Sequence, residues 1–483
     1  MTGVLPPART RPAAGWQAGI AALAAMGLLA WITSGRPGVS FVDFVTFADR
    51  AHHLGDPSAW MHALYPVGYP LLLAAGRAVL GDVVLAGEVL GVLAGSFLVW
   101  TAARSLGLGA ALWLLGSGTI LAGGVLEGTD LPAAALSVAA LLSAAHARDA
   151  GHGREALRWS AWAGVLAGAA CLVRYTAVPV PILVLVAAPR RGAALAGIAI
   201  LLVPHLAGAW IAGESPLPDQ RGNLGIAWGP HGSPWHPDTL RRWPDGFVRA
   251  MGHAAPGVAG GLGLAGLAVG LLLRDRRAAL LGGLAVVHSS VLAMLFSNPR
   301  LALPAHACVL LGATFLPPGL AAWLARRPGT ARYALLAGRG GAFVLGVLGL
   351  VLAARAAPAL RVPPPEAQAV SLLAQRAGGL SGPFLSNSPW FHVRRDGWVE
   401  GAVQIRSVAA DPRTFGPEDL ARVMDRGRVP YVALEIGRLT RDLPGLSPLV
   451  QVRVPGFRRL LRAQGWMVLV REPPVSLIAP DAA

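Results

Sequence analysis

Apolar segments of about 20 residues recur along most of this chain, and they limit the folds that it can adopt. They follow one another between residues 16 and 357, with short charged breaks between them. A helix of that length crosses the hydrocarbon core of a bilayer. With 54% hydrophobic and 14% charged residues and a mean hydropathy of +0.54, the chain has more apolar surface than a soluble domain could bury. We therefore expect a polytopic membrane protein that is mostly α-helical.

The apolar segments predict about eleven transmembrane helices. Their ranges are 16–33, 83–103, 108–126, 131–146, 159–173, 175–188, 193–211, 256–273, 278–296, 301–324 and 341–357. An odd number of crossings would place the two termini on opposite sides of the membrane. The segments 159–173 and 175–188 leave an alternative, a single kinked element or a shallow hairpin, because Pro179 and Pro181 interrupt the second one.

Arginine marks one side of the predicted membrane domain. Arginine-bearing breaks and the N-terminus fall on the same face when the predicted spans alternate, and cytoplasmic loops are the ones enriched in basic residues. The arginines in question are Arg9, Arg11, Arg104, Arg148, Arg154, Arg158, Arg190, Arg191, Arg274, Arg276, Arg277, Arg326, Arg327 and Arg332. We expect a multi-pass protein of the plasma membrane with a cytoplasmic N-terminus and an extracytoplasmic C-terminus.

After residue 360, the long apolar runs give way to a mixture of polar and apolar residues. The transmembrane domain is predicted over 1–360, and an extracytoplasmic soluble domain over 361–483, behind a stiff linker at Pro363–Pro365. Within this tail, helix signals occupy 366–376 and 417–425, and strand signals occupy 431–436 and 466–470. The alternation predicts a small α/β fold.

Several functional classes receive no support from the residues. The net charge of +16 sits in short loops rather than on one basic face, so nucleic acid is not expected as a partner. Cys171 and Cys308 lie far apart in apolar runs, which is typical of small buried side chains. Neither a Walker loop nor a nucleophile elbow occurs, so chemistry driven by a nucleotide is not expected.

The first predicted external loop contains the leading catalytic candidate. Asp43 follows the first span by about ten residues, and nearby aromatic side chains would partly desolvate its carboxylate and raise its basicity. The alternative is that Asp43 caps a helix over 44–54. The loop ends in the turn Tyr65-Pro66-Val67-Gly68-Tyr69-Pro70. Residues 65–80 are too short to span, and we expect an interfacial helix with Tyr65 and Tyr69 at headgroup depth.

Three further external positions carry charged candidates. Glu127 and Asp130 lie at the junction of two spans; the alternative reading is that Thr129 or Asp130 caps the next helix. Arg300 precedes the span that begins Leu-Ala-Leu-Pro, where its guanidinium fork suits a phosphate, while snorkelling to lipid headgroups is the competing explanation. Arg174 adjoins Tyr175 within an apolar segment, at a depth that the sequence leaves open.

The first loop, the acidic junction and the Arg300 segment together resemble GT-C glycosyltransferases. In that superfamily, an aspartate follows the first span, a Tyr-Pro-x-Gly-Tyr-Pro-like turn follows it, and an Arg-Tyr-x-x-Pro segment occurs later; here leucine replaces that tyrosine. The tail also resembles the external domain of glycosyltransferase family 39, which includes aminoarabinose transferases and protein mannosyltransferases. The order of spans and loops resembles that superfamily over roughly the first 360 residues.

This resemblance implies an enzyme that transfers a monosaccharide from a polyprenyl-phosphate donor on the extracytoplasmic face, with inversion at the sugar carbon. It implies Asp43 as the base, Glu127 or Asp130 as a helper, and Arg300 with Arg174 as ligands of the donor phosphate. The expected partners are the lipid-linked sugar, a lipid, protein or glycan acceptor, and membrane lipids. No cofactor is assigned, and a divalent cation is left open. The alternative function is a transporter or lipid flippase.

The long predicted loop over 212–255 has a composition suited to closing over a sugar. Arg221 and Arg241 within it, with Tyr65 and Tyr69, are the candidates for substrate contacts. His52, His53 and His62 lie near Asp43, but adjacent histidines on a helix point apart, so solvent-exposed side chains are the favoured interpretation over a metal site.

Overall fold

A computed structural model describes most of the chain. The described residues are 13–35, 42–55, 66–125, 128–211, 236–294, 299–327, 329–362, 384–387, 392–395, 398–401, 403–405, 409, 411, 414–463 and 465–472. They fall into two compact units. The first comprises residues 1–33, 50–76 and 86–360, and the second comprises 34–49, 77–85 and 361–483.

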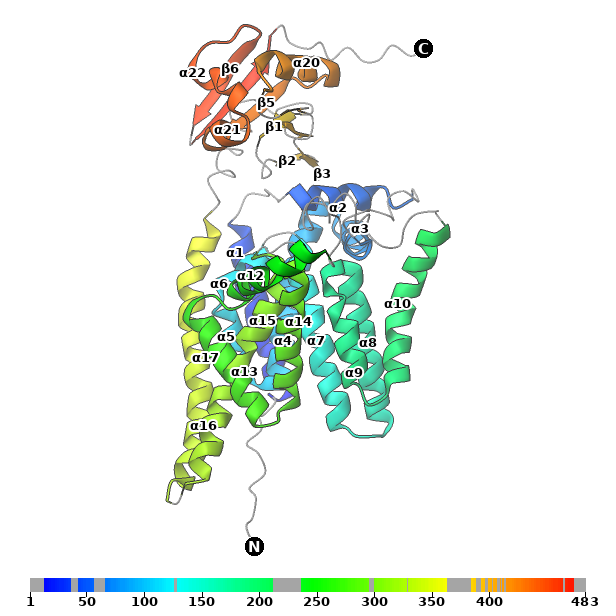
Figure 1. Cartoon of the computed structure of the whole chain (residues 1–483), viewed down its shortest axis with the longest axis vertical. Helices are drawn as coiled ribbons and strands as arrows, with labels where there is room; N and C mark the ends of the chain where they lie inside the picture. The colour runs from blue at the N-terminus through cyan, green and yellow to red at the C-terminus, as the bar shows by residue number, and fades with distance from the viewer. Residues whose placement is uncertain are drawn as a thin grey trace. The chain divides into compact units, whose positions relative to one another are not determined.

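Helices make up the first unit and its connections (Figure 1). The long helices are α1 (Gly15–Ser34), α4 (Val83–Leu106), α7 (Asp130–Asp149), α8 (Arg154–Val173), α10 (Arg191–Ile211), α12 (Pro237–Ala254), α13 (Gly257–Leu272), α14 (Arg276–Met294) and α17 (Ala331–Arg361). The shorter ones are α2 (Val42–His52), α3 (Gly68–Leu80), α5 (Leu108–Leu115), α6 (Gly118–Val125), η2 (Tyr175–Ala177), α9 (Pro179–Ala187), α15 (Leu303–Gly312), η4 (Ala313–Phe315) and α16 (Leu316–Ala325).

Eight helical segments of the described chain are long and apolar enough to cross a membrane, or nine if the bent pair α12 and α13 counts as one span. The protein is therefore an integral membrane protein with a mostly helical fold, as the sequence predicts. The count is lower than the expected eleven because two predicted spans are not continuous long helices. Segment 108–126 divides at Gly116 into α5 and α6, and segment 175–188 contains only the short elements η2 and α9.

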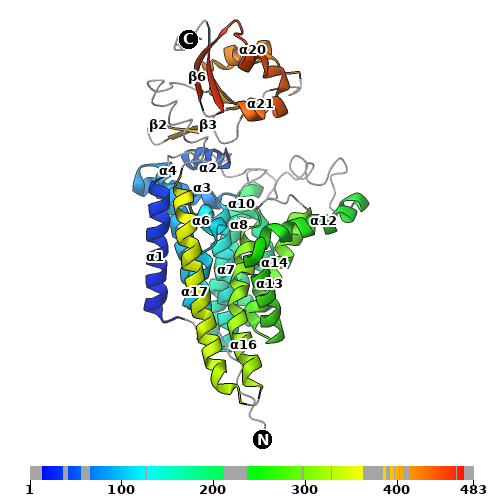
Figure 2. The same ribbon diagram turned by 90° about the vertical axis from the view of Figure 1, so that its left-hand side faces the viewer.

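Helix α7 lies inside the bundle. It packs against α8, α9, α14 and α15, and both views place it among them (Figures 1 and 2). Small residues allow close packing of this kind, since backbones approach where no side chain intervenes. At Gly164 of α8, an added Cβ would collide with the backbone of Ala194 in α10. The resulting core is rich in alanine and leucine, and it extends from Leu98 to Phe315.

The region 237–254 differs from the sequence-based expectation. It was expected to belong to a long loop, but it forms the 18-residue helix α12, with Pro237 in the first turn and Nδ1 of His236 accepting a hydrogen bond from the amide of Asp238. Helix α12 meets α13 at an angle of 103°. Its charged residues keep its average hydropathy low, so the apolar runs in the sequence do not predict this helix.

The second unit contains an α/β fold. Strands β1 (Phe384–Ser386), β4 (Val403–Gln404), β5 (Tyr431–Glu435), β6 (Phe457–Ala463) and β7 (Trp466–Arg471) form one sheet in the order β4-β1-β5-β7-β6, and β2 (His392–Arg395) pairs with β3 (Trp398–Gly401). Strand β1 runs parallel to β4 and β5, while β5, β7 and β6 are antiparallel. Helices α20 (Pro417–Gly427), α21 (Ile436–Asp442) and α22 (Pro448–Gln451), with η5 (Pro444–Leu446), complete it.

Three predicted elements of this tail are confirmed. They are the helix over 417–425, observed as α20, and the two strands over 431–436 and 466–470, observed as β5 and β7. Their buried side chains, including Leu420, Val432 and Leu469, share one core. The predicted helix over 366–376 and the proline linker lie outside the described residues.

Candidate functional site

Asp130 begins helix α7, and its carboxylate is the centre of the candidate site. Leu131 and Pro132 follow it and are buried, so the first turn is held by packing while the aspartate stays at the helix end. A carboxylate at this end is also favoured by the helix dipole. The side chain of Asp130 is only 13% exposed, which means that it requires cationic or hydrogen-bonding partners.

Arg174 supplies the first partner. It follows α8 directly in an extended conformation, with φ −155° and ψ 124°, and this break in the helix turns its side chain toward the start of α7. Nη1 of Arg174 lies 2.7 Å from Oδ1 of Asp130 and donates a hydrogen bond to Oγ1 of Thr129. Its Nε atom is buried and has no hydrogen-bond partner among the described residues.

Arg300 supplies the second partner from a distant part of the chain. Its Nε atom donates a hydrogen bond of 3.0 Å to Oδ2 of Asp130. The segment that carries it is held by His288 of α14, whose Nε2 lies 2.9 Å from the carbonyl oxygen of Leu301. Arg300 is more exposed than the other two residues, at 29% of its side chain.

The cluster Asp130–Arg174–Arg300 therefore contains one carboxylate between two guanidinium groups. Its formal charge is positive, since the single anion cannot neutralise both cations. Two arginines in a partly dehydrated position are well suited to a phosphate, which guanidinium groups bind through paired hydrogen bonds. The sequence predicted all three residues as candidates, and the structure brings them together.

A second group of side chains lies around Tyr175, the residue after Arg174. Arg50, near the end of α2, is only 5% exposed, and its Nη1 donates a hydrogen bond of 3.3 Å to the carbonyl oxygen of Pro66. Burial lowers the pKa of Arg50 to about 10, an effect that Tyr175 partly opposes. Tyr175, next to Arg174 in sequence, lies with its Oη atom 3.4 Å from Nε2 of His205. Neither Arg50 nor His205 belongs to a recognisable motif, so the sequence did not point to them.

The turn after the first predicted loop packs against the same region. Gly68 lies against the end of α8, and a Cβ at this position would come within 2.5 Å of the carbonyl oxygen of Leu172. Glycine is therefore required for the close approach of the two backbones. Helix α3 begins at this glycine, as expected for a short helix that does not span, and the side chain of Tyr69 is fully buried within the protein.

Most of the other candidates fall outside the described part of the protein. Asp43 lies in the first turn of α2, so a helix does begin there; the position of its side chain is outside the described part of the protein. Glu127, Tyr65 and Arg221 also lie outside the described residues. Arg241 is exposed on α12, where Nη1 lies 3.7 Å from Oδ1 of Asp238, and this differs from the expected substrate loop.

Within the described residues, no group of three or more His, Cys, Asp or Glu side chains is arranged to hold a metal ion. Cys171 and Cys308 are buried free thiols in the helical unit. The described part of the candidate site thus consists of arginine, aspartate and hydroxyl groups. Such a set can bind a phosphate and position a proton-accepting carboxylate.

No family model matches the chain, and no curated protein matches it either. Solved structures do match. ArnT from Cupriavidus metallidurans in the apo state is similar over 96% of this chain and 99% of its own, with 15% identity and a TM-score of 0.55. The structure of the same protein bound to undecaprenyl phosphate matches over 95% and 98%, with 14% identity and a TM-score of 0.53.

The chain has a GT-C fold. A third structure supports this conclusion, the archaeal oligosaccharyltransferase AglB from Archaeoglobus fulgidus in complex with an inhibitory peptide and a dolichol-phosphate. It matches 90% of this chain and 72% of its own, with 13% identity and a TM-score of 0.52. The resemblance inferred from the sequence motifs is therefore confirmed at the level of the fold.

Proposed function

We propose that this protein is a membrane glycosyltransferase that transfers a monosaccharide from a polyprenyl-phosphate donor to an acceptor. The observation that carries the proposal is the cluster Asp130–Arg174–Arg300, in which two partly buried guanidinium groups converge on one carboxylate. Support comes from the shared fold with ArnT, whose solved structure is bound to undecaprenyl phosphate. A transporter is less favoured, because these three charged side chains lie together at the start of α7 rather than along a path through the bundle.

The proposed roles follow from charge and geometry. Arg300 and Arg174 would bind the donor phosphate and stabilise the charge that develops on it when the sugar leaves. The unpaired Nε of Arg174 is a donor that a phosphate oxygen can use. Asp130 would hold both guanidinium groups in place before the donor binds and contact the acceptor with Glu127.

Asp43 is the proposed general base. In the reaction, an acceptor hydroxyl oxygen forms a bond to the anomeric carbon from the face opposite the phosphate. The bond between that carbon and the phosphate oxygen breaks, its electron pair leaves with polyprenyl phosphate, and the configuration inverts. The proton of the acceptor hydroxyl passes to the carboxylate of Asp43, as a general base requires.

We further propose that the reaction takes place on the extracytoplasmic side of the plasma membrane. The arginine-bearing helix ends, such as Arg148 in α7 and Arg276 at the start of α14, support this orientation, since Asp130 lies at the other end of α7. The region 361–483 would then be an extracytoplasmic domain. The acceptor is a lipid, a protein or a glycan.

The test is sugar transfer by membrane vesicles that contain the full chain, with radiolabelled polyprenyl-phosphate hexoses and pentoses as donors. Arg300→Gln removes the guanidinium that contacts Asp130, and we expect it to reduce transfer by at least about 100-fold, the range seen when one charge-stabilising donor is lost. The matched control is Arg249→Gln, which alters an exposed arginine of α12 and should retain native transfer.

The outcomes separate the alternatives. Transfer by the native protein and by Arg249→Gln, but not by Arg300→Gln at equal expression, would support the proposed phosphate site. Equal transfer by all three proteins would contradict the role of Arg300. If none of them transfers sugar from any donor, while labelled lipid crosses the vesicle membrane, the protein is a flippase.

A further inference from the structure

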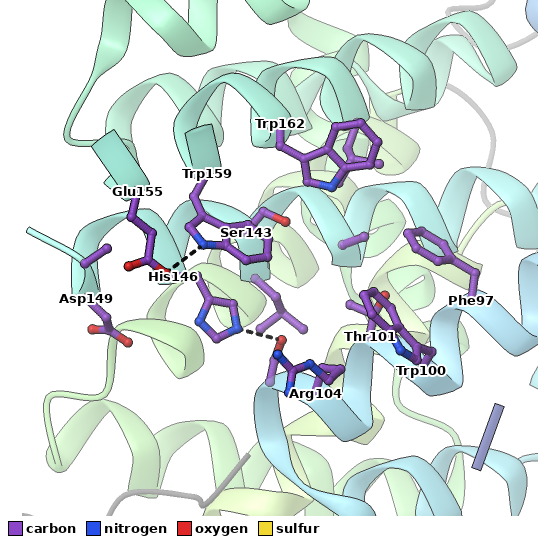
Figure 3. A pocket seen from close by; sticks show the side chains of 15 residues that line it. Phe97, Trp100, Thr101, Arg104, Ser143, His146, Asp149, Glu155, Trp159 and Trp162 are labelled. Carbon is purple, nitrogen blue, oxygen red and sulfur yellow. Dashed lines mark hydrogen bonds between the residues drawn. The ribbon is translucent and has the colours of Figure 1, made fainter. Parts of the chain in front are cut away.

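A cavity of about 450 Å³ lies at the other end of helix α7, away from Asp130 (Figure 3). Its lining includes His146 and Asp149 near the end of α7, together with residues of α4 and α8. Because a helix rises 1.5 Å per residue, His146 lies about 24 Å along α7 from Asp130. A ligand in this cavity cannot touch the Asp130–Arg174–Arg300 cluster, so the cavity requires a separate explanation.

Aromatic rings form two walls of the cavity. Phe97 and Trp100 come from α4 and are stacked with their centroids 6.0 Å apart. Trp159 and Trp162 come from α8, and Figure 3 shows them across the cavity from the α4 pair. Trp100 and Trp162 are 39% and 49% exposed. Tryptophan side chains gather in this way where a membrane helix meets the headgroup layer.

One side of the cavity offers groups that bind a phosphate. The guanidinium group of Arg104 lines it, and Thr101 lies one turn earlier on α4. The side chain of Thr101 is only 5% exposed, yet its Oγ1 has no hydrogen-bond partner among the described residues. An unpaired buried hydroxyl is unfavourable, and a phosphate oxygen beside Arg104 would accept its hydrogen bond.

The other side offers carboxylates beside tryptophan. Glu155 of α8 accepts a hydrogen bond of 3.4 Å from Nε1 of Trp159 through Oε1, which leaves its second oxygen available. Asp149 lies nearby, but Arg277 already pairs with it at 3.1 Å. Glu155 is thus the better acceptor for an added cation, and an ammonium group is also attracted to the faces of neighbouring indole rings.

A hydrogen-bonded pair separates the two sides. Oγ of Ser105 lies 3.2 Å from Nε2 of His146, and the imidazole ring lies against Trp159 with centroids 5.4 Å apart. Figure 3 shows His146 between Arg104 and the carboxylates. The cavity therefore presents a cationic group, a hydrogen-bonded Ser105–His146 pair and an anionic group, next to tryptophan rings that are partly exposed.

We propose that the cavity binds a phospholipid whose headgroup contains both a phosphate and an amine, such as phosphatidylethanolamine. Arg104 and Thr101 bind the phosphate, Glu155 and the indole rings of Trp159 and Trp162 bind the ammonium group, and the acyl chains follow the exposed aromatic side chains into the bilayer. This site is distinct from the proposed donor site, and it does not depend on the proposed transfer activity.

The test is native mass spectrometry of the full protein in detergent, supplied with equal amounts of phosphatidylethanolamine and phosphatidylglycerol. The native protein should retain the amine-bearing lipid in preference. Glu155→Gln keeps the size of the side chain but removes its charge, and we expect about tenfold weaker retention, as for the loss of one charged hydrogen bond. The matched control is Arg154→Gln, an exposed neighbour that does not line the cavity.

Each outcome decides the proposal. Preference for phosphatidylethanolamine that falls in Glu155→Gln and in Trp162→Ala, but not in Arg154→Gln, supports it, provided that all variants elute as the native protein does. Equal retention of both lipids, or retention unchanged by Glu155→Gln, would overturn it. Displacement of the lipid by soluble glycerophosphoethanolamine at equimolar concentration would also overturn it, because the site would then take a free phosphate ester.

Discussion

The Nε atom of Arg300 donates a hydrogen bond of 3.0 Å to Oδ2 of Asp130, across 170 positions of sequence. Arg174 approaches the other carboxylate oxygen at 2.7 Å. Without the carboxylate between them, the two guanidinium groups would repel each other. Asp130 therefore keeps them together. The proposed donor site therefore depends on a residue that need not touch the donor itself.

Asp130 and Arg174 should be energetically coupled. Removal of one member of a largely buried ion pair leaves the other uncompensated and costs about 3–5 kcal/mol. We expect Asp130→Asn and Arg174→Gln each to destabilise the protein, and the double variant to be less destabilised than the sum of both. A double-mutant cycle on unfolding free energy should give a coupling of about 1–3 kcal/mol. Additive effects would show that the contact contributes no stability.

Replacement of Arg174 by lysine should change donor binding more than the chemical step. Lysine keeps the charge but lacks the planar guanidinium group, in which Nη1 contacts both Asp130 and Thr129 while the buried Nε is left for the donor. In the vesicle assay, we expect Arg174→Lys to raise KM for the polyprenyl-phosphate donor about tenfold, since a charged hydrogen bond is worth about 1.5 kcal/mol, with kcat within about threefold of native. A fall in kcat at unchanged KM would place Arg174 elsewhere in the mechanism.

Arg50 should support the turn before α3. Its buried guanidinium donates to the carbonyl oxygen of Pro66, and methionine at this position would keep the apolar stem but leave that oxygen without its donor. We expect Arg50→Met to destabilise the protein by about 1–3 kcal/mol, measured as a lower thermal midpoint in detergent. Arg249→Met, at an exposed arginine of α12, is the control; equal losses in the two variants would refute a specific role for Arg50.

Gly68 should not tolerate a side chain. A Cβ there would lie 2.5 Å from the carbonyl oxygen of Leu172, whereas a Cβ at Gly19 of α1 would have nothing within 4 Å. Forcing a packed interface apart costs about 1–3 kcal/mol. We therefore expect Gly68→Ala to lower the thermal midpoint and Gly19→Ala to leave it unchanged or raise it. If Gly68→Ala is as stable as the native protein, the close contact with α8 is absent.

Helix α20 should lose stability in acid. The backbone amide of Gly416 donates a hydrogen bond of 2.9 Å to Asp419, and this bond, with the neighbouring Arg422, lowers the pKa of Asp419 below 3.8. A carboxylate with a lowered pKa in the folded state stabilises it above the unfolded pKa, and this contribution disappears as the pH falls toward the folded value.

The measurement is amide hydrogen exchange of α20 in the full protein, expressed at each pH as the ratio of native to Asp419→Ala protection. This ratio should exceed one near neutral pH and approach one as the pH falls through the lowered pKa of Asp419. The variant Asp425→Ala removes a different carboxylate, which pairs with Arg471 at 2.9 Å, and should leave the α20 N-terminus protected. A ratio that does not change with pH would contradict the proposed role of Asp419.

The sequence predicted the class of fold because membrane residence depends on local composition. Apolar runs of sufficient length must become helices in lipid, where backbone groups have no other partners, and this rule located α1, α4, α7, α8, α10, α14 and α17. The same rule missed α12, whose residues are polar, and it joined α5 and α6 into one span. A polar helix has the low average hydropathy of a loop, and a break at Gly116 changes that average too little to be recognised.

For the candidate site too, the sequence showed the residue types, and the tertiary structure was needed to show their arrangement. Its residue types could be selected from the sequence, because charged side chains at the ends of apolar runs are few: Asp130, Arg174 and Arg300 were all identified. Their convergence on one carboxylate required the tertiary structure. Contacts across 170 positions depend on how α7, α8 and the start of α15 pack together, and such packing is a property of whole helix surfaces that no local pattern encodes.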